Sequence, residues 1–273
     1  MKKITHYRWG NRYCIVSSLL LLSILFISWC FFSTFLEVLT LDYSAPDLVD
    51  SNKYEVMRMM LNGVLSWENF IDSSMRYVIY IFPIFALLPI VAFHGEKKLY
   101  LQQGYHRFKN YRLEVIKTIL HYSLIGGLVI ALTFVAYFTL ASFFMTASIE
   151  NIGGYASIFP SDFYSNYPYL FFVFMAMTIY FAIGFTFALL GCGISMLVDN
   201  KYLIVAIPLS LYLLDAYILG GLGVVNFQIF MSVCSFNTLL TTVESFIPLI
   251  PFITLAIIVN FIGIRKNQRL MEW

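Results

Sequence analysis

Histidine and cysteine have the widest chemical repertoire of the residues in this chain, and their spacing argues against the common catalytic and metal sites. The chain has 4 histidines and 4 cysteines. No two histidines form an H-E-x-x-H pair, which excludes a zinc-protease helix. No two cysteines form a C-x-x-C pair, so we interpret the cysteines as small packing residues rather than metal ligands or a disulfide framework.

The motifs for nucleotide and acyl chemistry are also absent from the sequence. There is no G-x-x-x-x-G-K-[ST] run to cradle ATP phosphates and no G-x-S-x-G nucleophile turn. We therefore expect a chain that is not an enzyme and binds no cofactor itself. If ATP drives its function, another polypeptide must bind the nucleotide.

One acid, Asp215, lies well inside a long apolar segment. An ionised carboxylate within a membrane span costs several kcal/mol unless it is paired or hydrated, so such a residue is a functional candidate. The alternative is that Asp215 reaches water near the outer end of a short helix, just before Gly220 and Gly221. Both interpretations stay open from the sequence.

The segment from His94 to Lys117 combines basic residues with a repeated apolar pattern. Apolar residues recur every three or four positions, and Gly104 divides the pattern into two short pieces. A basic amphipathic helix of this kind fits a partner's groove or lies on an anionic membrane surface. The apolar positions are Leu101, Tyr105, Phe108, Tyr111 and Val115. The charged candidates are Glu96, Lys97, Lys98, Arg107, Lys109 and Arg112.

The composition of the whole chain predicts the elements that carry these residues. Of the 273 residues, 60% are hydrophobic and 12% are charged, whereas a soluble domain has roughly 25% charged residues. The mean hydropathy is +0.80. These values predict an all-α integral membrane protein in contact with the lipid bilayer. The net charge of +2 gives no support for a nucleic-acid partner.

Long apolar runs predict six transmembrane helices in one domain covering residues 1–273. Residues 222–240 are apolar enough to suggest a seventh span, but Asn226, Gln228 and Asn237 would then lie in hydrocarbon. We therefore expect a non-spanning outer segment, re-entrant or interfacial, between the fifth and sixth helices. The predicted spans are 14–36, 77–93, 119–148, 169–198, 202–219 and 246–264.

The basic residues predict the orientation of these helices. All of the 17 lysines and arginines except Lys53, Arg58 and Arg76 fall on one side of the six-span arrangement. Because basic residues accumulate in cytoplasmic loops, both termini are expected in the cytoplasm and the protein in the cell membrane.

Three further patterns accompany the spans. Residues 57–65 have helical apolar spacing, which predicts an amphipathic helix lying on the outer leaflet. The aromatic-rich segment 150–168 indicates an interfacial belt or a ligand-binding lip. Small residues on the third and fourth spans predict close helix packing, within one subunit or between two. They are Gly127, Ala131, Gly184, Ala188, Gly191, Cys192 and Ser195.

The layout resembles that of the permease subunit of ABC-2-type exporters over nearly the whole chain. The similarity lies in topology and loop character. A basic amphipathic stretch precedes the first helix, a basic loop with Glu96-Lys97-Lys98 joins the second and third, and an apolar non-spanning segment precedes the sixth. The residues of the N-terminal stretch are His6, Arg8, Trp9, Arg12 and Tyr13.

This resemblance implies that two six-helix subunits, identical or homologous, pair around a translocation pathway. A separate ATP-binding cassette subunit, carrying ATP and Mg²⁺, would dock on the N-terminal helix and on residues 96–112. The outer gate would include Gly220, Gly221 and Asn226, with Asp215 beside it. Two alternatives remain: a stand-alone immunity or resistance protein that binds a partner, and a secondary transporter.

Overall fold

The computed structural model describes residues 7–42, 52–102, 108, 110–149, 152–238 and 240–271, and within these ranges the regular structure is helical. Six helical segments are long and apolar enough to cross a membrane. This confirms the predicted all-α class and the multi-pass membrane character. The six segments are Arg12–Phe32, Trp67–Glu96, Tyr111–Ala141, Pro168–Leu197, Lys201–Gly221 and Glu244–Arg269.

Some of these segments consist of more than one helical element. The first, third, fifth and sixth rest on α1 (Tyr7–Phe32), α6 (Tyr111–Ala141), α10 (Lys201–Gly221) and α12 (Leu249–Met271). The second consists of α4 (Trp67–Leu87) and α5 (Ile90–Glu96), followed by a π-helix, η2 (Lys97–Gln102). The fourth consists of α8 (Pro168–Met175), a π-helix, η5 (Ala176–Tyr180), and α9 (Phe181–Leu197).

The shorter elements lie between these spans, except η8, which begins the sixth segment. They are α2 (Phe35–Thr40), α3 (Lys53–Val64), η4 (Gly154–Ile158), α7 (Phe163–Asn166), η6 (Val225–Phe227), α11 (Ile229–Val233), η7 (Ser235–Asn237) and η8 (Glu244–Phe246).

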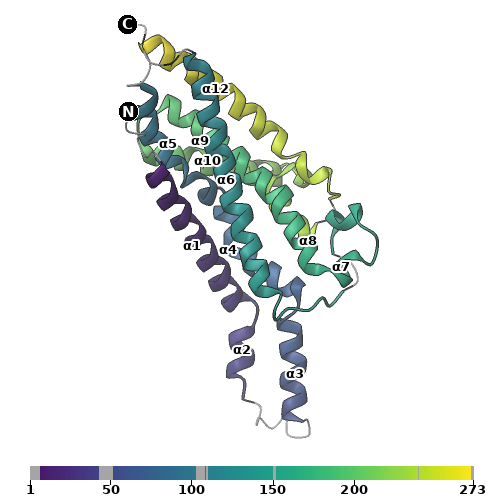
Figure 1. Ribbon diagram of the computed structural model, residues 1–273. Helices are drawn as coiled ribbons and strands as arrows, with labels where there is room; N and C mark the ends of the chain where they lie inside the picture. Colours follow the sequence, from purple (N-terminus) through teal and green to yellow (C-terminus); the bar gives the residue numbers. More distant parts are fainter. Residues whose placement is uncertain are drawn as a thin grey trace.

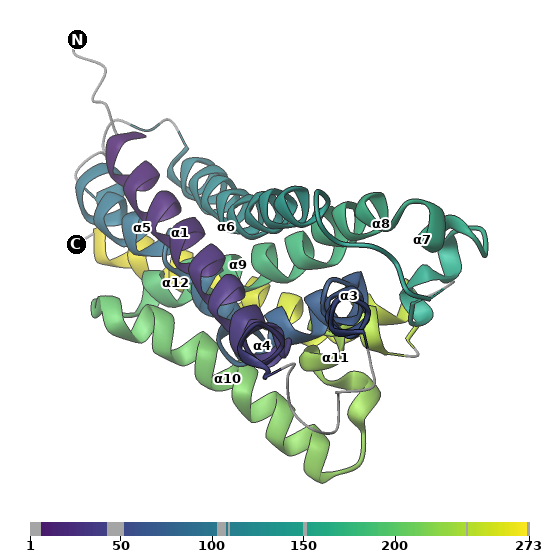
Figure 2. The same ribbon diagram turned by 90° about the horizontal axis from the view of Figure 1, so that it is seen from below.

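Helix α9 occupies the centre of the bundle and contacts α4, α5, α6, α10 and α12 (Figure 2). Glycines allow its closest approach to α6, since a Cβ on Gly184 would lie 3.0 Å from the Cα of Gly127. On the α12 side, a Cβ on Gly263 would lie 2.6 Å from the Cβ of Met196. Gly127 and Gly184, two of the small residues predicted to mediate close packing, therefore do so within one chain.

The bundle has two chemically different ends. One end, the basic end, is where α1, α6 and α10 begin and where α5, α9 and α12 end (Figure 1). Its described cationic residues are Arg12, Lys97, Lys98, Arg112, Lys117, Lys201, Arg265, Lys266 and Arg269. At the opposite end, the far end, the basic side chains that the structure describes are Arg58 and Arg76.

Two spans begin earlier than the apolar runs predicted. The second begins at Trp67 rather than Tyr77, because Ser66 caps it by accepting a hydrogen bond from the amide of Asn69 at 3.3 Å. The third begins at Tyr111 rather than Ile119, with Asn110 as its cap. Because the first turns of both helices are polar, hydropathy alone did not predict where these helices start.

The first span ends earlier than predicted. Helix α1 stops at Phe32, and Thr34 has a left-handed backbone with φ 61° before α2 starts. This conformation is a genuine outlier for a β-branched residue. The continuous helix predicted over 14–36 is therefore wrong beyond Phe32.

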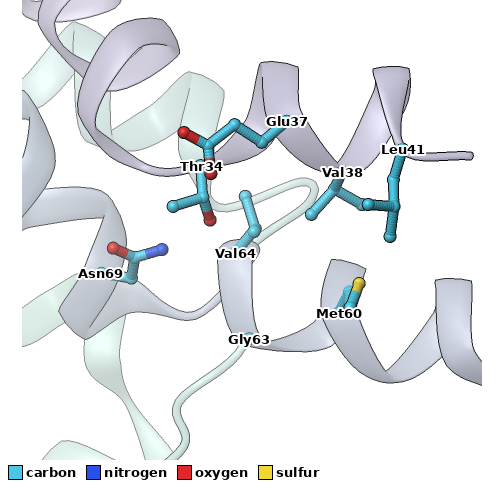
Figure 3. A pocket seen from close by; sticks show the side chains of 8 residues that line it. All are labelled: Thr34, Glu37, Val38, Leu41, Met60, Gly63, Val64 and Asn69. Carbon is cyan, nitrogen blue, oxygen red and sulfur yellow. The ribbon is translucent and has the colours of Figure 1, made fainter. Parts of the chain in front are cut away.

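Helices α2 and α3 contact each other and project from the far end (Figure 1). Figure 3 shows Val38 of α2, and Leu41 just after it, facing Met60 and Val64 of α3 across a cavity of about 360 Å³. A helix in this segment is thus confirmed, but its apolar stripe faces α2 instead of lying flat against a leaflet.

The aromatic segment before α8 folds onto the bundle. Tyr155 and Tyr164 are buried, and the rings of Phe159 and Phe163 stack with centroids 4.3 Å apart. Tyr164 packs edge-on against Phe171 of α8. These rings form a packed cap on the far end, so part of the aromatic segment serves as core.

Candidate functional site

The candidate site at the basic end is built around the buried side chain of Lys97, the first residue of η2. Only 3% of this side chain is exposed. Its Nζ donates a hydrogen bond of 2.7 Å to the carbonyl oxygen of Ser195 and lies 3.4 Å from Oδ1 of Asp199. Lys97, which the sequence predicted to lie in a docking loop, is therefore anchored at the end of the central helix, α9.

The local sequence explains why acceptors are available at this point. The last carbonyl groups of a helix lack intrahelical partners and carry the negative end of its dipole. Helix α9 ends because Val198 is extended, and Asn200 then caps α10 by accepting from the amide of Tyr202 at 2.9 Å. Asp199 lies in the turn between the two helices, beside the last carbonyls of α9.

Polar side chains from α12 and α5 complete this cluster. Asn267 donates to the carbonyl of Met196 at 2.7 Å, and Lys266 donates to that of Leu197 at 3.2 Å. Nδ1 of His94 lies 3.2 Å from Oγ of Ser195. The end of α9 is thus connected to both neighbouring helices by polar contacts.

The charges in the cluster influence one another. Burial lowers the pKa of Lys97, and the carboxylate of Asp199 partly opposes that shift. The Lys97 ammonium and its hydrogen bond hold the pKa of Asp199 below its usual value. Lys98 adds a second, more exposed cation 4.0 Å from Asp199.

The other predicted docking residues are placed as follows. Glu96 is half-buried at the end of α5. Arg112 donates from Nε to Oε1 of Gln268 at 2.6 Å, which joins the start of α6 to the end of α12. Arg107 and Lys109 lie outside the described residues. Among the docking candidates, Lys97 and Lys98 converge on one partner, Asp199, which sequence analysis did not select.

At the far end, Asp215 contributes to the structure of the non-spanning segment. Its Oδ2 accepts a hydrogen bond of 2.9 Å from the amide of Ile229, the first residue of α11. Gln228 donates to the carbonyl of Ala216 at 2.9 Å, and Gly220 packs so closely that an added Cβ would lie 2.7 Å from Nε2 of Gln228. The segment is therefore fastened to the last turns of α10.

The remaining gate candidates lie on this outer segment. Gly221 has open space where a side chain would be. Asn226 lines a cavity of about 490 Å³ together with Asn237 and Glu244. In the described part of residues 222–240, the longest helix, α11, has 5 residues and is too short to cross a bilayer.

Sequence reasoning missed Glu68, which organises the far end. Its carboxylate accepts hydrogen bonds from the Ser148 hydroxyl at 2.6 Å and the Tyr164 hydroxyl at 2.8 Å, and from the Ser148 amide at 3.1 Å. The helix start at Ser66 was the signal that could have revealed it. No three histidine, cysteine or acidic side chains come together to hold a metal in the described ranges.

Comparisons with known proteins give no assignment. No protein-family model matches the chain. No curated protein matches it. No solved structure matches it either.

Proposed function

We propose that this chain is the membrane-spanning permease subunit of an ATP-driven exporter of the ABC-2 type. It would pair with a second, identical or homologous permease subunit. A separate ATP-binding cassette subunit would bind ATP and Mg²⁺ and dock at the basic end, in the cytoplasm. The observation that carries the proposal is the buried contact of Lys97, which connects the segment after the second span to the end of the central helix.

The contacts suggest how movement at the basic end would reach the far end. A partner that pulls on the segment after Lys97 displaces the Ser195 carbonyl and the turn containing Asp199. That turn leads directly into α10, whose far end holds the outer segment through Asp215. A shift in the basic-end segment would thereby bias the outer segment between two positions.

Partner capture tests the docking part of this proposal. The tagged protein is purified from its native membranes in mild detergent, and the bound proteins are identified by mass spectrometry. We expect a P-loop ATPase with the native chain and severalfold less of it with the Lys98→Ala/Arg107→Ala/Lys109→Ala variant. A matched control, Lys53→Ala/Arg58→Ala/Arg76→Ala, removes the same number of charges at the far end and should retain the ATPase.

The coupling part is tested separately with a fluorophore on Asn226→Cys. Addition of ATP to the purified complex should change the fluorescence of this far-end probe. Lys97→Met should retain the ATPase subunit but lose the ATP-dependent signal. If no ATPase is captured while a known transporter complex from the same membranes stays intact, the exporter proposal fails.

A second candidate is an immunity or resistance protein that acts by binding a partner without transport. The observation that favours it is the projecting pair α2 and α3, with its cavity of about 360 Å³ (Figure 3). The side chains of Tyr54 and Met59 on α3 are exposed. This candidate predicts that Tyr54→Ala/Met59→Ala abolishes the protective effect, whereas the basic-end variant above leaves it unchanged.

A further inference from the structure

The last turns of α12 present an exposed groove whose chemistry changes along the helix. Its volume is about 490 Å³, and it is lined by Phe261, Ile262, Arg265, Lys266 and Arg269. The apolar side chains are half exposed, Phe261 at 54% and Ile262 at 50%. The three cations follow these apolar residues, and the last of them, Arg269, lies eight residues after Phe261, about 12 Å along the helix axis.

This order matches the boundary between hydrocarbon and headgroups. Helix α12 belongs to the last candidate membrane span, which ends at Arg269. When Phe261 and Ile262 lie among acyl chains, Arg265 and Arg269 lie at the level of the lipid phosphates. The guanidinium of Arg265 stands 4.1 Å from the centroid of the Phe261 ring, so the polar and apolar walls of the groove are continuous.

Among the described residues, the cations of the groove lack an acidic partner, unlike Lys97, Lys98 and Lys117 at the same end. Among the described residues, no carboxylate pairs with Arg265, Lys266 or Arg269. By contrast, Lys117 pairs with Glu114 at 2.9 Å, and Lys97 and Lys98 face Asp199. Arg112 brings a further guanidinium to the same turn of α12 through its hydrogen bond to Gln268.

We propose that this groove binds one anionic phospholipid. An acyl chain would lie along Phe261 and Ile262, and the phosphate would be held by Arg265, Lys266 and Arg269. Clustered basic residues next to a span attract anionic headgroups, and the apolar wall selects a lipid over a free phosphate. The site is independent of the proposed exporter function, because it depends only on α12 crossing a membrane.

Occupancy would also affect the packing of α12 on α9. Lys266 holds the Leu197 carbonyl, and its neighbour Asn267 holds that of Met196. A phosphate that neutralises Arg265 and Arg269 reduces the repulsion among three neighbouring cations. We therefore expect the bound lipid to stabilise the end of α12 against α9.

The test measures retention of phosphatidylglycerol by the purified full-length protein, using native mass spectrometry with phosphatidylcholine as the zwitterionic comparison. We expect preferential retention of phosphatidylglycerol and, for Arg265→Gln/Arg269→Gln, a loss of affinity on the order of tenfold. The control Lys117→Gln/Lys201→Gln removes the same charge at the same end and should retain the lipid. Arg265→Lys/Arg269→Lys keeps the charge and should also retain most of it.

Three outcomes would overturn the proposal. The first is equal retention of phosphatidylcholine and phosphatidylglycerol by the native protein. The second is an equal loss in the glutamine variant and the matched control. The third is displacement of the lipid by glycerol phosphate, which would indicate a phosphate site without an acyl-chain contribution. Circular dichroism and gel filtration establish that each variant is folded before its affinity is compared.

Discussion

The ammonium group of Lys97 is buried, since only 3% of the side chain is exposed. It donates a hydrogen bond to the carbonyl of Ser195 near the end of α9. Burying such a charge is unfavourable unless it is paired and hydrogen-bonded. Asp199 supplies a charge, but its own side chain is 81% exposed, so water shares in its solvation. The hydrogen bond to Ser195 is therefore the more important contact for stability.

Replacing Lys97 by methionine should lower the melting temperature. The variant keeps most of the length of the side chain but leaves the Ser195 carbonyl without this donor, at a cost of about 1–3 kcal/mol. Lys98→Met is the control, because the Lys98 side chain is 49% exposed and lies 4.0 Å from Asp199. Its effect should stay within about 1 kcal/mol. Tryptophan fluorescence during heating in detergent measures both, and equal losses would contradict this account of Lys97.

The contribution of Asp199 to stability should depend on pH in the acid range. Its pKa is lowered in the folded state, so its stabilising effect is fully present above the unfolded value of 3.8. The effect is lost as the pH falls through the lower folded value, because the carboxyl then takes up a proton. The difference in melting temperature between the native protein and Asp199→Asn should shrink below pH 3.8.

The background of Lys97→Met separates this effect from a general loss of charge. In that background the main partner of Asp199 is missing, so Asp199→Asn should change the melting temperature less at neutral pH. A difference of undiminished size in the Lys97→Met background would show that the stabilisation does not arise from this pair.

At the scale of the elements, the approach of α6 to α9 depends on glycine. A Cβ on Gly127 would lie 2.9 Å from the carbonyl oxygen of Phe181, and backbone cannot move aside as a side chain can. Gly127→Ala should therefore force the helices apart and cost about 1–3 kcal/mol.

Gly95→Ala is the matched control for that substitution. Gly95 lies in α5, and a Cβ there would meet nothing within 4 Å. Alanine is favoured over glycine inside a helix by about 0.5–1 kcal/mol, so this variant should be neutral or more stable. Thermal unfolding of the two variants side by side measures the contrast. A loss of stability in both would contradict the close-packing explanation for Gly127.

The sequence predicted six helices long and apolar enough to span a membrane, the number found among the described residues, but it did not predict some of their boundaries. Hydropathy identified six apolar runs, but the helix starts at Trp67 and Tyr111 depend on the caps Ser66 and Asn110. The break at Thr34 left no clear signal, because its left-handed backbone is unusual for threonine. Local composition predicts which segments are apolar enough to lie in lipid. It predicts less well where a capped helix begins.

At the scale of the whole molecule, the candidate site was only partly predictable. Charge patterning selected Lys97 and Lys98 as members of one basic segment. It could not reveal that Lys97 turns inward to α9, 98 residues later in the chain, since this contact depends on how the helices pack. Asp215 shows the same limit, because its partner, the amide of Ile229, is a backbone group with no sequence signature.

The asymmetric distribution of basic residues predicts that the basic end faces the cytoplasm. Single cysteines and a membrane-impermeant maleimide test this orientation in a chain whose four native cysteines are replaced. Met59→Cys, on the projecting α3, should be labelled in intact cells, since the Met59 side chain is 72% exposed. Lys201→Cys and Arg269→Cys, both at the basic end, should be labelled only after lysis.

The pattern of labelling distinguishes two kinds of error. If all three positions exchange their behaviour, the six-span arrangement holds but its orientation is reversed. If Arg269→Cys is labelled in intact cells together with Met59→Cys while Lys201→Cys is not, an odd number of spans separates Arg269 from Lys201, as a crossing of the bilayer by residues 222–240 would produce. The hydrogen bonds that fasten this segment to α10 through Asp215 and Gln228 predict against that crossing. A span would have to break both bonds and carry Asn226 and Asn237 into hydrocarbon, which is costly for unpaired amides.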